Sequence, residues 1–150
     1  MEIEVEPATI RMLKALCEIE QKCFREEAFS KQQISCLLTD YNAVSLIARI
    51  EGNVAGFVIG RIDKVRRSAG GHILTIDVVP PYRRNGIATR LMIEIEEFFK
   101  QKGVIESHLE VREGNFAALT LYEKLGYKKI SRLDNYYGLA HGFYLKKALK

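Results

Sequence analysis

A turn between a β-branched run and a helical pattern carries the clearest chemical signal in the sequence. The stretch VVPPYRRNGIATRLM, residues 78–92, contains Arg83, Arg84 and Gly86 but no acidic residue. Free backbone N–H groups and the helix dipole make a helix start an anion site, and glycine permits close approach of the anion. We interpret the turn as a phosphate or pyrophosphate site, with a solvated loop as the alternative. The motifs GxxxxGK[ST] and GxGxxG are absent, which argues against a nucleoside triphosphatase and a dinucleotide-dependent dehydrogenase.

Glu110 and His72 are the side chains best suited to proton transfer. Glu110 lies in LEVR, an otherwise apolar strand pattern, and is a candidate general base; a solvent-facing residue paired with Arg112 or a lysine is the alternative. His72 opens the strand that leads into the turn, where an imidazole can relay a proton through water; a structural role is the alternative. The other histidines, His108 and His141, show no metal-ligand spacing, so we expect no metal.

The turn residues Arg83, Gly86 and Ala88 follow the pattern (Q/R)xxGx(G/A), which resembles the signature of the GNAT superfamily of N-acetyltransferases. Downstream, LEVREGNFAALTLYEKLGY, residues 109–127, resembles the second conserved block of that family. The ending DNYYGLAHGFYLKKAL resembles that of N-terminal protein acetyltransferases, including the ribosomal-protein type. The resemblance implies an acetyl-CoA-dependent N-acetyltransferase with the GNAT fold, in one domain over residues 1–150.

The resemblance also implies where acetyl-CoA would bind. The cofactor would lie in a V between the strands TIDVV and SHLEV, with the backbone of Val78 and Val79 facing its pantetheine arm. Asn115 would contact it from the next helix, and no metal takes part. The backbone of the turn would wrap the pyrophosphate, through Arg83, Arg84, Asn85, Gly86, Ile87, Ala88 and Thr89.

Catalytic roles follow from the same resemblance. In ribosomal-protein acetyltransferases the residue matching Glu110 acts as the base and the residue matching Tyr122 acts as the acid. A packed tyrosine on a helix is the alternative for Tyr122. Some N-terminal acetyltransferases carry a catalytic tyrosine at the position of His72, which keeps this histidine among the catalytic candidates.

Two segments bear on the acceptor. The loop NYYG, with Tyr136 and Tyr137, resembles the loop whose tyrosines hold a peptide N-terminus. The segment KCFREEAFS stands where relatives carry an FPxPW-like loop that shapes the pocket for the first residue, which indicates Phe24 and Phe29. The family's proline is missing there, so the first-residue preference stays open.

We therefore predict direct acetyl transfer to the α-amino group of a protein or peptide N-terminus, with ribosomal proteins among the candidate acceptors. A polyamine, another small amine or a lysine side chain is the alternative, because Glu26 and Glu27 would attract a basic amine. A non-catalytic module that binds CoA or nucleic acid is an alternative of another class, suggested by the basic stretch DKVRRSAGG. No aromatic residues interleave with its arginines, so we expect no nucleic-acid partner.

Hydrophobic periodicity indicates the elements that position these residues. It predicts the order β-α-α-β-β-β-α-β-α-β-β, an α/β (α+β) fold with a mixed central sheet whose splayed central strands are flanked by helices. Helices are expected from about Thr9, after an N-cap at Ser30, over residues 86–103 and after an N-cap at Asn115. Residues 64–71 and NYYG are expected to be loops.

The composition is consistent with this interpretation. A length of 150 residues fits one domain, and a formal net charge of +4 suits an anionic ligand without identifying nucleic acid. The three cysteines, Cys17, Cys23 and Cys36, have no CxxC spacing and indicate a reducing compartment. We expect neither a signal peptide nor a membrane span, hence no membrane partner and a cytoplasmic location.

Overall fold

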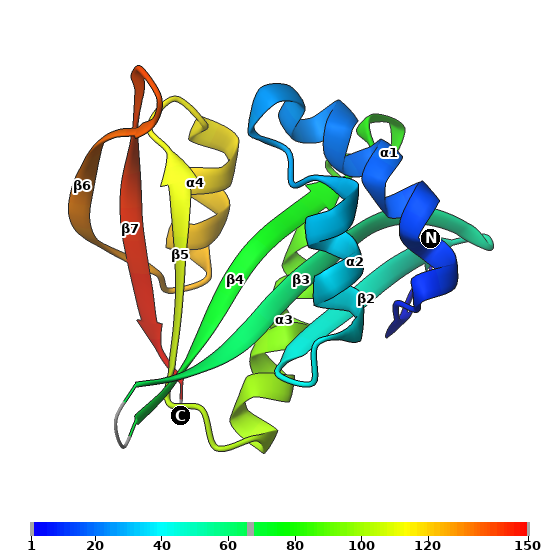
Figure 1. Ribbon diagram of the computed structural model, residues 1–150, viewed down its shortest axis with the longest axis horizontal. Helices are drawn as coiled ribbons and strands as arrows, with labels where there is room; N and C mark the ends of the chain where they lie inside the picture. The colour runs from blue at the N-terminus through cyan, green and yellow to red at the C-terminus, as the bar shows by residue number, and fades with distance from the viewer. Residues whose placement is uncertain (1, 66–67, 150) are drawn as a thin grey trace.

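The computed structural model describes residues 2–65 and 68–149, and it shows a mixed sheet with helices on both faces (Figure 1). Seven strands in these ranges pair in the order β1-β2-β3-β4-β5-β7-β6, and β4 with β5 is the parallel pair among antiparallel neighbours. The strands are β1 (Ile3–Pro7), β2 (Ala43–Ile50), β3 (Asn53–Val65), β4 (Ser68–Val78), β5 (Glu106–Arg112), β6 (Lys128–Tyr137) and β7 (Ala140–Ala148).

Four α-helices and three short 3₁₀ turns lie within the same ranges, and their order along the chain confirms the predicted one. Ser30 and Gln33 form a capping box at the start of α2, as the sequence predicted for Ser30. Asn115 caps α4 by accepting a hydrogen bond from the backbone of Ala118 at 3.2 Å. The elements are η1 (Ile10–Met12), α1 (Leu13–Phe24), η2 (Arg25–Glu27), α2 (Lys31–Thr39), η3 (Pro80–Tyr82), α3 (Ile87–Gln101) and α4 (Phe116–Lys124).

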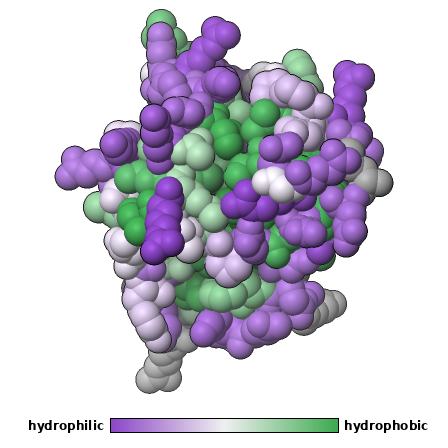
Figure 2. Space-filling view, turned by 90° about the vertical axis from the view of Figure 1, so that its right-hand side faces the viewer, coloured by the Kyte–Doolittle hydropathy of each residue, from purple (hydrophilic) through white to green (hydrophobic). Residues whose placement is uncertain are grey.

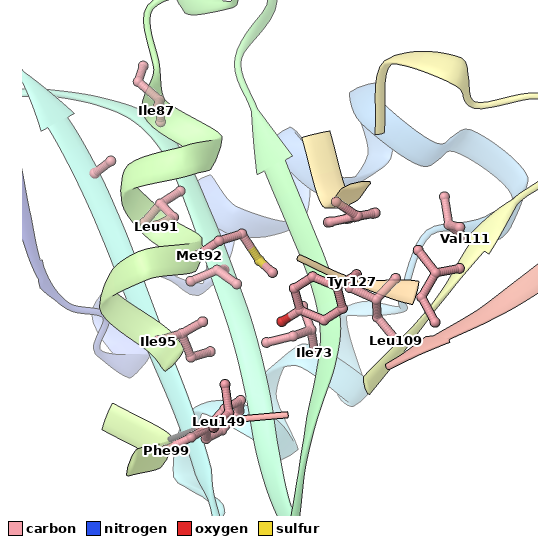
Figure 3. Packing of buried hydrophobic residues seen from close by; sticks show 14 of the residues in the cluster. Ile73, Ile87, Leu91, Met92, Ile95, Phe99, Leu109, Val111, Tyr127 and Leu149 are labelled. Carbon is pink, nitrogen blue, oxygen red and sulfur yellow. The ribbon is translucent and has the colours of Figure 1, made fainter. Parts of the chain in front are cut away.

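Two apolar clusters hold the layers together. The larger packs α3 and α4 against one face of the sheet, and the smaller packs α1 and α2 against the other face. Along α3 the buried residues recur every third or fourth position and point at the sheet, as Figure 3 shows for Ile87, Leu91, Ile95 and Phe99. The Phe99 ring lies so close to β4 that a Cβ on Gly71 would come within 2.4 Å of it.

The central strands separate as the sequence interpretation required. Parallel pairing between β4 and β5 is limited to three residue pairs and ends at His72↔His108. Beyond that pair β4 continues to Val78 and β5 continues to Arg112, and Figure 1 shows the two strands diverging. The edges that face each other across this V have backbone groups that no neighbouring strand pairs.

The structure corrects three local predictions. Residues 64–71 were expected to be a loop, but β3 and β4 pair as far as Val65↔Ser68, so the connection is a hairpin, and Arg66 and Arg67 lie outside the described residues. The NYYG segment belongs to β6 up to Tyr137, which pairs with Ala140 across a tight turn. At the first helix, expected from about Thr9, a 3₁₀ turn over Ile10–Met12 precedes α1, and the Thr9 side chain makes no cap hydrogen bond.

The surface seen from the right of Figure 1 carries apolar areas interrupted by hydrophilic side chains (Figure 2). Among residues 2–65 and 68–149, no helix combines the length and the apolar character needed to cross a lipid bilayer.

Candidate active site

The turn that leads into α3 has the backbone geometry of an anion site. Gly86 adopts the left-handed conformation, with φ of 79°, and precedes the first helical residue, Ile87. Arg84 also has a positive φ, of 67°. No side chain caps the helix start and no acidic residue lies in its first turn, so its N–H groups are available to a ligand. A Cβ on Gly86 would meet nothing within 4 Å, so the left-handed backbone, rather than a close neighbour, explains the glycine there.

The polar side chains of the turn divide into two kinds. The Asn85 amide donates to the carbonyl oxygen of Tyr82 at 2.9 Å and so holds the turn in shape. The Arg83 guanidinium reaches back, with Nε donating to the Val78 carbonyl at 3.1 Å. Arg84 is exposed. Of the two arginines, Arg84 is therefore the one free to follow a ligand on the surface of the turn.

The two valines before the turn differ in what their backbone offers. Val79 N–H donates to Ala55 O at 2.8 Å, and Val79 O accepts from Tyr82 N–H at 2.8 Å. Backbone groups of successive strand residues point to opposite edges, so Val78 faces the open edge of β4. Val78 O accepts from Arg83 Nε, which leaves its N–H as the group directed into the V.

These features fit a cosubstrate with a pyrophosphate and an amide-rich arm. The α3 start supplies uncapped N–H groups, Arg84 supplies positive charge, and the V exposes strand backbone that can pair with amides. Asn115, whose side chain caps α4, can contact such a ligand only through its remaining hydrogen-bonding capacity. Ile87 is buried and anchors the turn, while Ala88 and Thr89 are half buried.

His72 and Glu110 meet at the point where β4 and β5 separate. The distance from His72 Nε2 to Glu110 Oε1 is 2.7 Å, and both side chains are about one-fifth exposed, at 19% and 18%. Glu110 lies two residues beyond the last β4–β5 backbone pair, so its hydrogen bond to His72 connects β4 and β5 where they begin to separate. The structure therefore shows in contact two candidate residues, His72 and Glu110, that the sequence indicated independently.

Tyr122 lies on α4 and is buried, with 5% of its surface exposed. Burial, followed by the charges of Tyr137 and Asp77, raises the pKa of the Tyr122 hydroxyl well above its ordinary value. Its ring packs edge-on against Tyr127 at 5.8 Å between centroids. A hydroxyl in this state keeps its proton at neutral pH.

One opening of the V is bordered by the α1–α2 segment, the end of β5 and the β6–β7 hairpin. Glu27 and Arg112 form an ion pair that joins the first two of these elements. Burial, then Tyr136 and Glu110, raises the pKa of Tyr137 well above its ordinary value. Tyr136 is 52% exposed and packs edge-on against Tyr137 at 4.9 Å.

The two phenylalanines of the α1–α2 segment occupy different environments. Phe24 ends α1 and is half buried. Phe29 packs into the apolar cluster below α1 and α2 and lines a cavity of about 470 Å³ beside α2. Phe29 therefore contributes to the packing that supports the segment, in addition to any contact with an acceptor.

Sequence reasoning missed a buried carboxyl pair on the face of β4 that contacts α1. Thr75 Oγ1 lies 2.8 Å from Glu20 Oε1 and 2.8 Å from Asp77 Oδ1. A hydroxyl has one proton and can donate to only one of them, so the other contact requires a protonated carboxyl as the donor. Burial, then the charge of Glu20, raises the pKa of Asp77 to about 9, so we assign this proton to Asp77.

The second oxygen of this carboxyl, Asp77 Oδ2, is buried and has no hydrogen-bond partner in the described part of the chain. Glu20 Oε2 accepts from Phe29 N–H at 3.0 Å, so the pair ties α1 and the α1–α2 segment to the strand that borders the V. The sequence signal was present, since an acidic residue inside the β-branched run TIDVV is unexpected.

Comparison with known proteins agrees with this geometry. The model of the acetyltransferase (GNAT) family matches residues 13–127. An N-alpha-acetyltransferase of Saccharolobus solfataricus is 33% identical over 120 residues, covering 72% of this chain and 70% of the relative. N-alpha-acetyltransferase 30 of Schizosaccharomyces pombe is 31% identical over 136 residues, covering 90% of each protein.

Among solved structures, the ribosomal-protein-S18-alanine N-acetyltransferase of Escherichia coli superposes with a TM-score of 0.87. The alignment covers 99% of this chain and 95% of the other at 23% identity, and it shows the fold. Enzymes of the family use acetyl-CoA and need no metal. Together with the uncapped helix start and the V between β4 and β5, the match shows that the chain belongs to the acetyltransferase (GNAT) family and is an acetyl-CoA-dependent N-acetyltransferase.

Proposed function

We propose that this protein acetylates the α-amino group of protein N-termini by direct attack, with Glu110 as general base and Tyr122 as general acid. The hydrogen-bonded pair of Glu110 and His72 at the apex of the V is the observation that carries the proposal. The names of the relatives support the choice of acceptor, because the archaeal and fission yeast proteins are both N-alpha-acetyltransferases.

The ionisation of the acceptor favours an α-amine. The pKa of an α-amino group is about 7.7–8.0 and that of lysine is about 10.4, so roughly a tenth of the α-amine is neutral at pH 7, against a few lysines in ten thousand. One weak base is therefore sufficient for an α-amine. Glu110, held by a single histidine, is such a base.

The proton movements can be assigned to groups of this chain. Acetyl-CoA supplies the acetyl thioester. Glu110 accepts the proton that the amine loses as its nitrogen bonds to the carbonyl carbon, and Val78 N–H faces the V, where it is a candidate donor to ligand oxygens. Tyr122 donates its proton to the sulfur as the carbon–sulfur bond breaks. Tyr122 then recovers a proton from solvent, and Glu110 releases to solvent the proton that it accepted.

His72 positions the base. With Nε2–H donating to Glu110 Oε1, the ring fixes one carboxylate oxygen and leaves the other outside this hydrogen bond. The neighbouring backbone pair His72↔His108 holds the ring at the end of the parallel ladder. A bound acceptor would thus meet a carboxylate of defined orientation.

A small polyamine is less well supported as acceptor. Glu27 is paired with Arg112, so one of the two carboxylates that would attract a polycation is already neutralised. Glu26 is exposed and remains available. The nucleic-acid alternative depended on the basic stretch DKVRRSAGG, of which Arg66 and Arg67 lie outside the described residues.

The test is an acetylation assay read by mass spectrometry with three acceptor pools. The pools contain lysine-free peptides with free N-termini, N-blocked peptides that contain lysine, and polyamines. We expect product in the first pool, and its first residues will define the preference of the pocket. Product confined to the second or third pool would overturn the proposed acceptor while leaving the acetyl-CoA site intact. Peptides that begin like ribosomal protein S18 belong in the first pool, because the E. coli enzyme of the same fold is named for that substrate.

A further inference from the structure

Asp63 of β3, His72 of β4 and His108 of β5 bring three possible metal ligands together. One donor atom from each residue lies within 4.8 Å of the other two. Asp63 Oδ2 lies 3.8 Å from His72 Nδ1, and the rings of His72 and His108 stack with 4.5 Å between centroids. The residues come from three adjacent strands, so the sheet register alone assembles the cluster.

We propose that Asp63, His72 and His108 form a binding site for one Zn²⁺ ion, and that its occupation inhibits acetyl transfer. Two imidazole nitrogens and a carboxylate oxygen are a donor set that zinc accepts, with water in the fourth position. Metal–donor distances of about 2.0–2.2 Å put tetrahedral donors roughly 3.4 Å apart. The distance of 3.8 Å from Asp63 Oδ2 to His72 Nδ1 is already close to this, and the donor atom of His108, within 4.8 Å of the other two, would have to move closer on binding.

The partners of His72 and Asp63 favour metal binding. His72 Nε2 lies 2.7 Å from Glu110 Oε1, and Nδ1, on the other side of the ring, lies 3.8 Å from Asp63 Oδ2. This is the carboxylate–histidine–metal arrangement that orients ligating histidines in zinc proteins. Asp63 Oδ1 accepts from Arg61 Nε at 2.9 Å, which leaves Oδ2 for the ion.

The surroundings of the third ligand, His108, also allow a cation to bind. The nearby Lys146 ammonium is paired with Glu106 at 3.1 Å, which reduces its repulsion of a cation. An entry path exists, since Asp63 and His108 line a cavity of about 340 Å³.

Inhibition follows from the link between His72 and Glu110, and this part of the inference rests on the proposed function. An ion held between His72 Nδ1 and Asp63 Oδ2 fixes the His72 ring in one position. The ring then holds Glu110 Oε1 through Nε2, 2.7 Å away, and the carboxylate is less free to turn toward the amine. The site is therefore regulatory, and the uninhibited reaction proceeds without the ion.

Binding is tested by calorimetric titration of the chelator-treated protein with ZnCl₂, without CoA. We expect one ion per chain, and about a hundredfold or greater loss of affinity in Asp63→Asn and in His108→Gln, since outer-sphere changes alone cost 10–100-fold. Asp134→Asn and His141→Gln are the matched controls, because Asp134 also pairs with an arginine two residues before it and lies 3.7 Å from His141 Nδ1. Unchanged affinity in Asp63→Asn and His108→Gln, or equal loss in the controls, would overturn the site.

Cobalt provides a readout that does not depend on the variants folding. Co²⁺ bound by two imidazoles and a carboxylate in the wild-type protein should show the visible bands of four-coordinate cobalt without a thiolate charge-transfer band. A thiolate band would assign the ion to Cys17, Cys23 or Cys36 and overturn the proposal. Circular dichroism of each variant verifies folding before its affinity is interpreted.

The inhibition is measured separately as initial rates with N-terminal peptides, before the CoA product can sequester zinc. Wild type should lose most of its activity at saturating Zn²⁺ and regain it with chelator, whereas Asp63→Asn should keep its basal rate and resist zinc. Zinc binding with the expected variant pattern but without peptide acetylation would leave the metal site standing and reject the proposed acceptor. Peptide acetylation in a protein that binds no zinc would reject the metal site alone.

Discussion

His72 Nε2 and Glu110 Oε1 lie 2.7 Å apart, although the residues are separated by 38 positions in sequence. The contact forms because β4 and β5 are paired only as far as His72↔His108. Glu110 is the next residue of β5 on the same face of the sheet as His108, and it reaches His72 where the two strands begin to separate. The apex of the V is therefore both the limit of the sheet ladder and the place of the candidate base.

Replacing the candidate base tests this relationship directly. Glu110→Gln should lower kcat by about 10²–10⁴, the usual contribution of general acid–base catalysis, and leave the KM for acetyl-CoA unchanged. Steady-state kinetics with an N-terminal peptide provides the measurement. Glu106→Gln, on the same strand and paired with Lys146, is the matched control and should retain most of its activity. Equal losses in the two variants would contradict the assignment.

The candidate acid is tested by removing one oxygen atom. Tyr122→Phe should lower kcat by about 10²-fold or more without weakening acetyl-CoA binding. Because burial raises the pKa of Tyr122 above its ordinary value of 10.0, wild-type kcat should show no decline due to this group up to about pH 10. A wild-type kcat that declines near pH 8, together with a flat pH profile in Tyr122→Phe, would contradict a raised pKa for Tyr122.

Tyr127→Phe is the structural counterpart of that substitution. The Tyr127 hydroxyl bonds to Ser107 at 2.6 Å and donates to Glu96 at 2.9 Å, so its removal leaves buried partners unsatisfied. It should cost about 1–3 kcal/mol of unfolding free energy with little change in kcat. Denaturant melts and kinetics on both tyrosine variants separate the two roles.

The pyrophosphate site is tested by charge reversal at the helix start. Arg84→Glu should raise the KM for acetyl-CoA about 5- to 30-fold, equivalent to 1–2 kcal/mol, with kcat little affected. Lys102→Glu makes the same change of charge beyond the other end of α3 and is the control. If both variants bind acetyl-CoA equally well, the anion does not lie at the turn.

The buried carboxyl pair predicts an unusual pH dependence of stability. The pKa of Asp77 is raised from 3.8 to about 9, so its contribution to stability is complete below about pH 4 and is lost as the pH rises through 9. Asp77→Asn removes this titration and should gain about 1–3 kcal/mol relative to wild type at pH 9 and little at pH 4. Urea melts at the two pH values measure the difference, and a gain that is independent of pH would show that Asp77 is charged in the folded protein.

Local patterns in the sequence determined the succession of elements and the backbone geometry of the turn before α3. Helix caps and left-handed turns depend only on residues a few positions apart, so they can be recognised from the sequence alone. This holds for the capping box of Ser30 and Gln33, the Asn115 cap and the left-handed Gly86. The spacing of apolar residues along α3 likewise needs only the period of a helix. Family-like motifs extended this to acetyl-CoA and to Glu110 and Tyr122.

Tertiary structure decided which side chains meet and in what protonation state. The Glu20–Asp77 pair joins a helix to a strand, and the cluster of Asp63, His72 and His108 crosses three strands, so both depend on sheet register and helix docking. His108 shows no metal-ligand spacing in the sequence, because Asp63 and His72 lie far from it along the chain. Burial sets the pKa of Asp77, and burial is a property of the packed molecule that no short stretch of sequence contains.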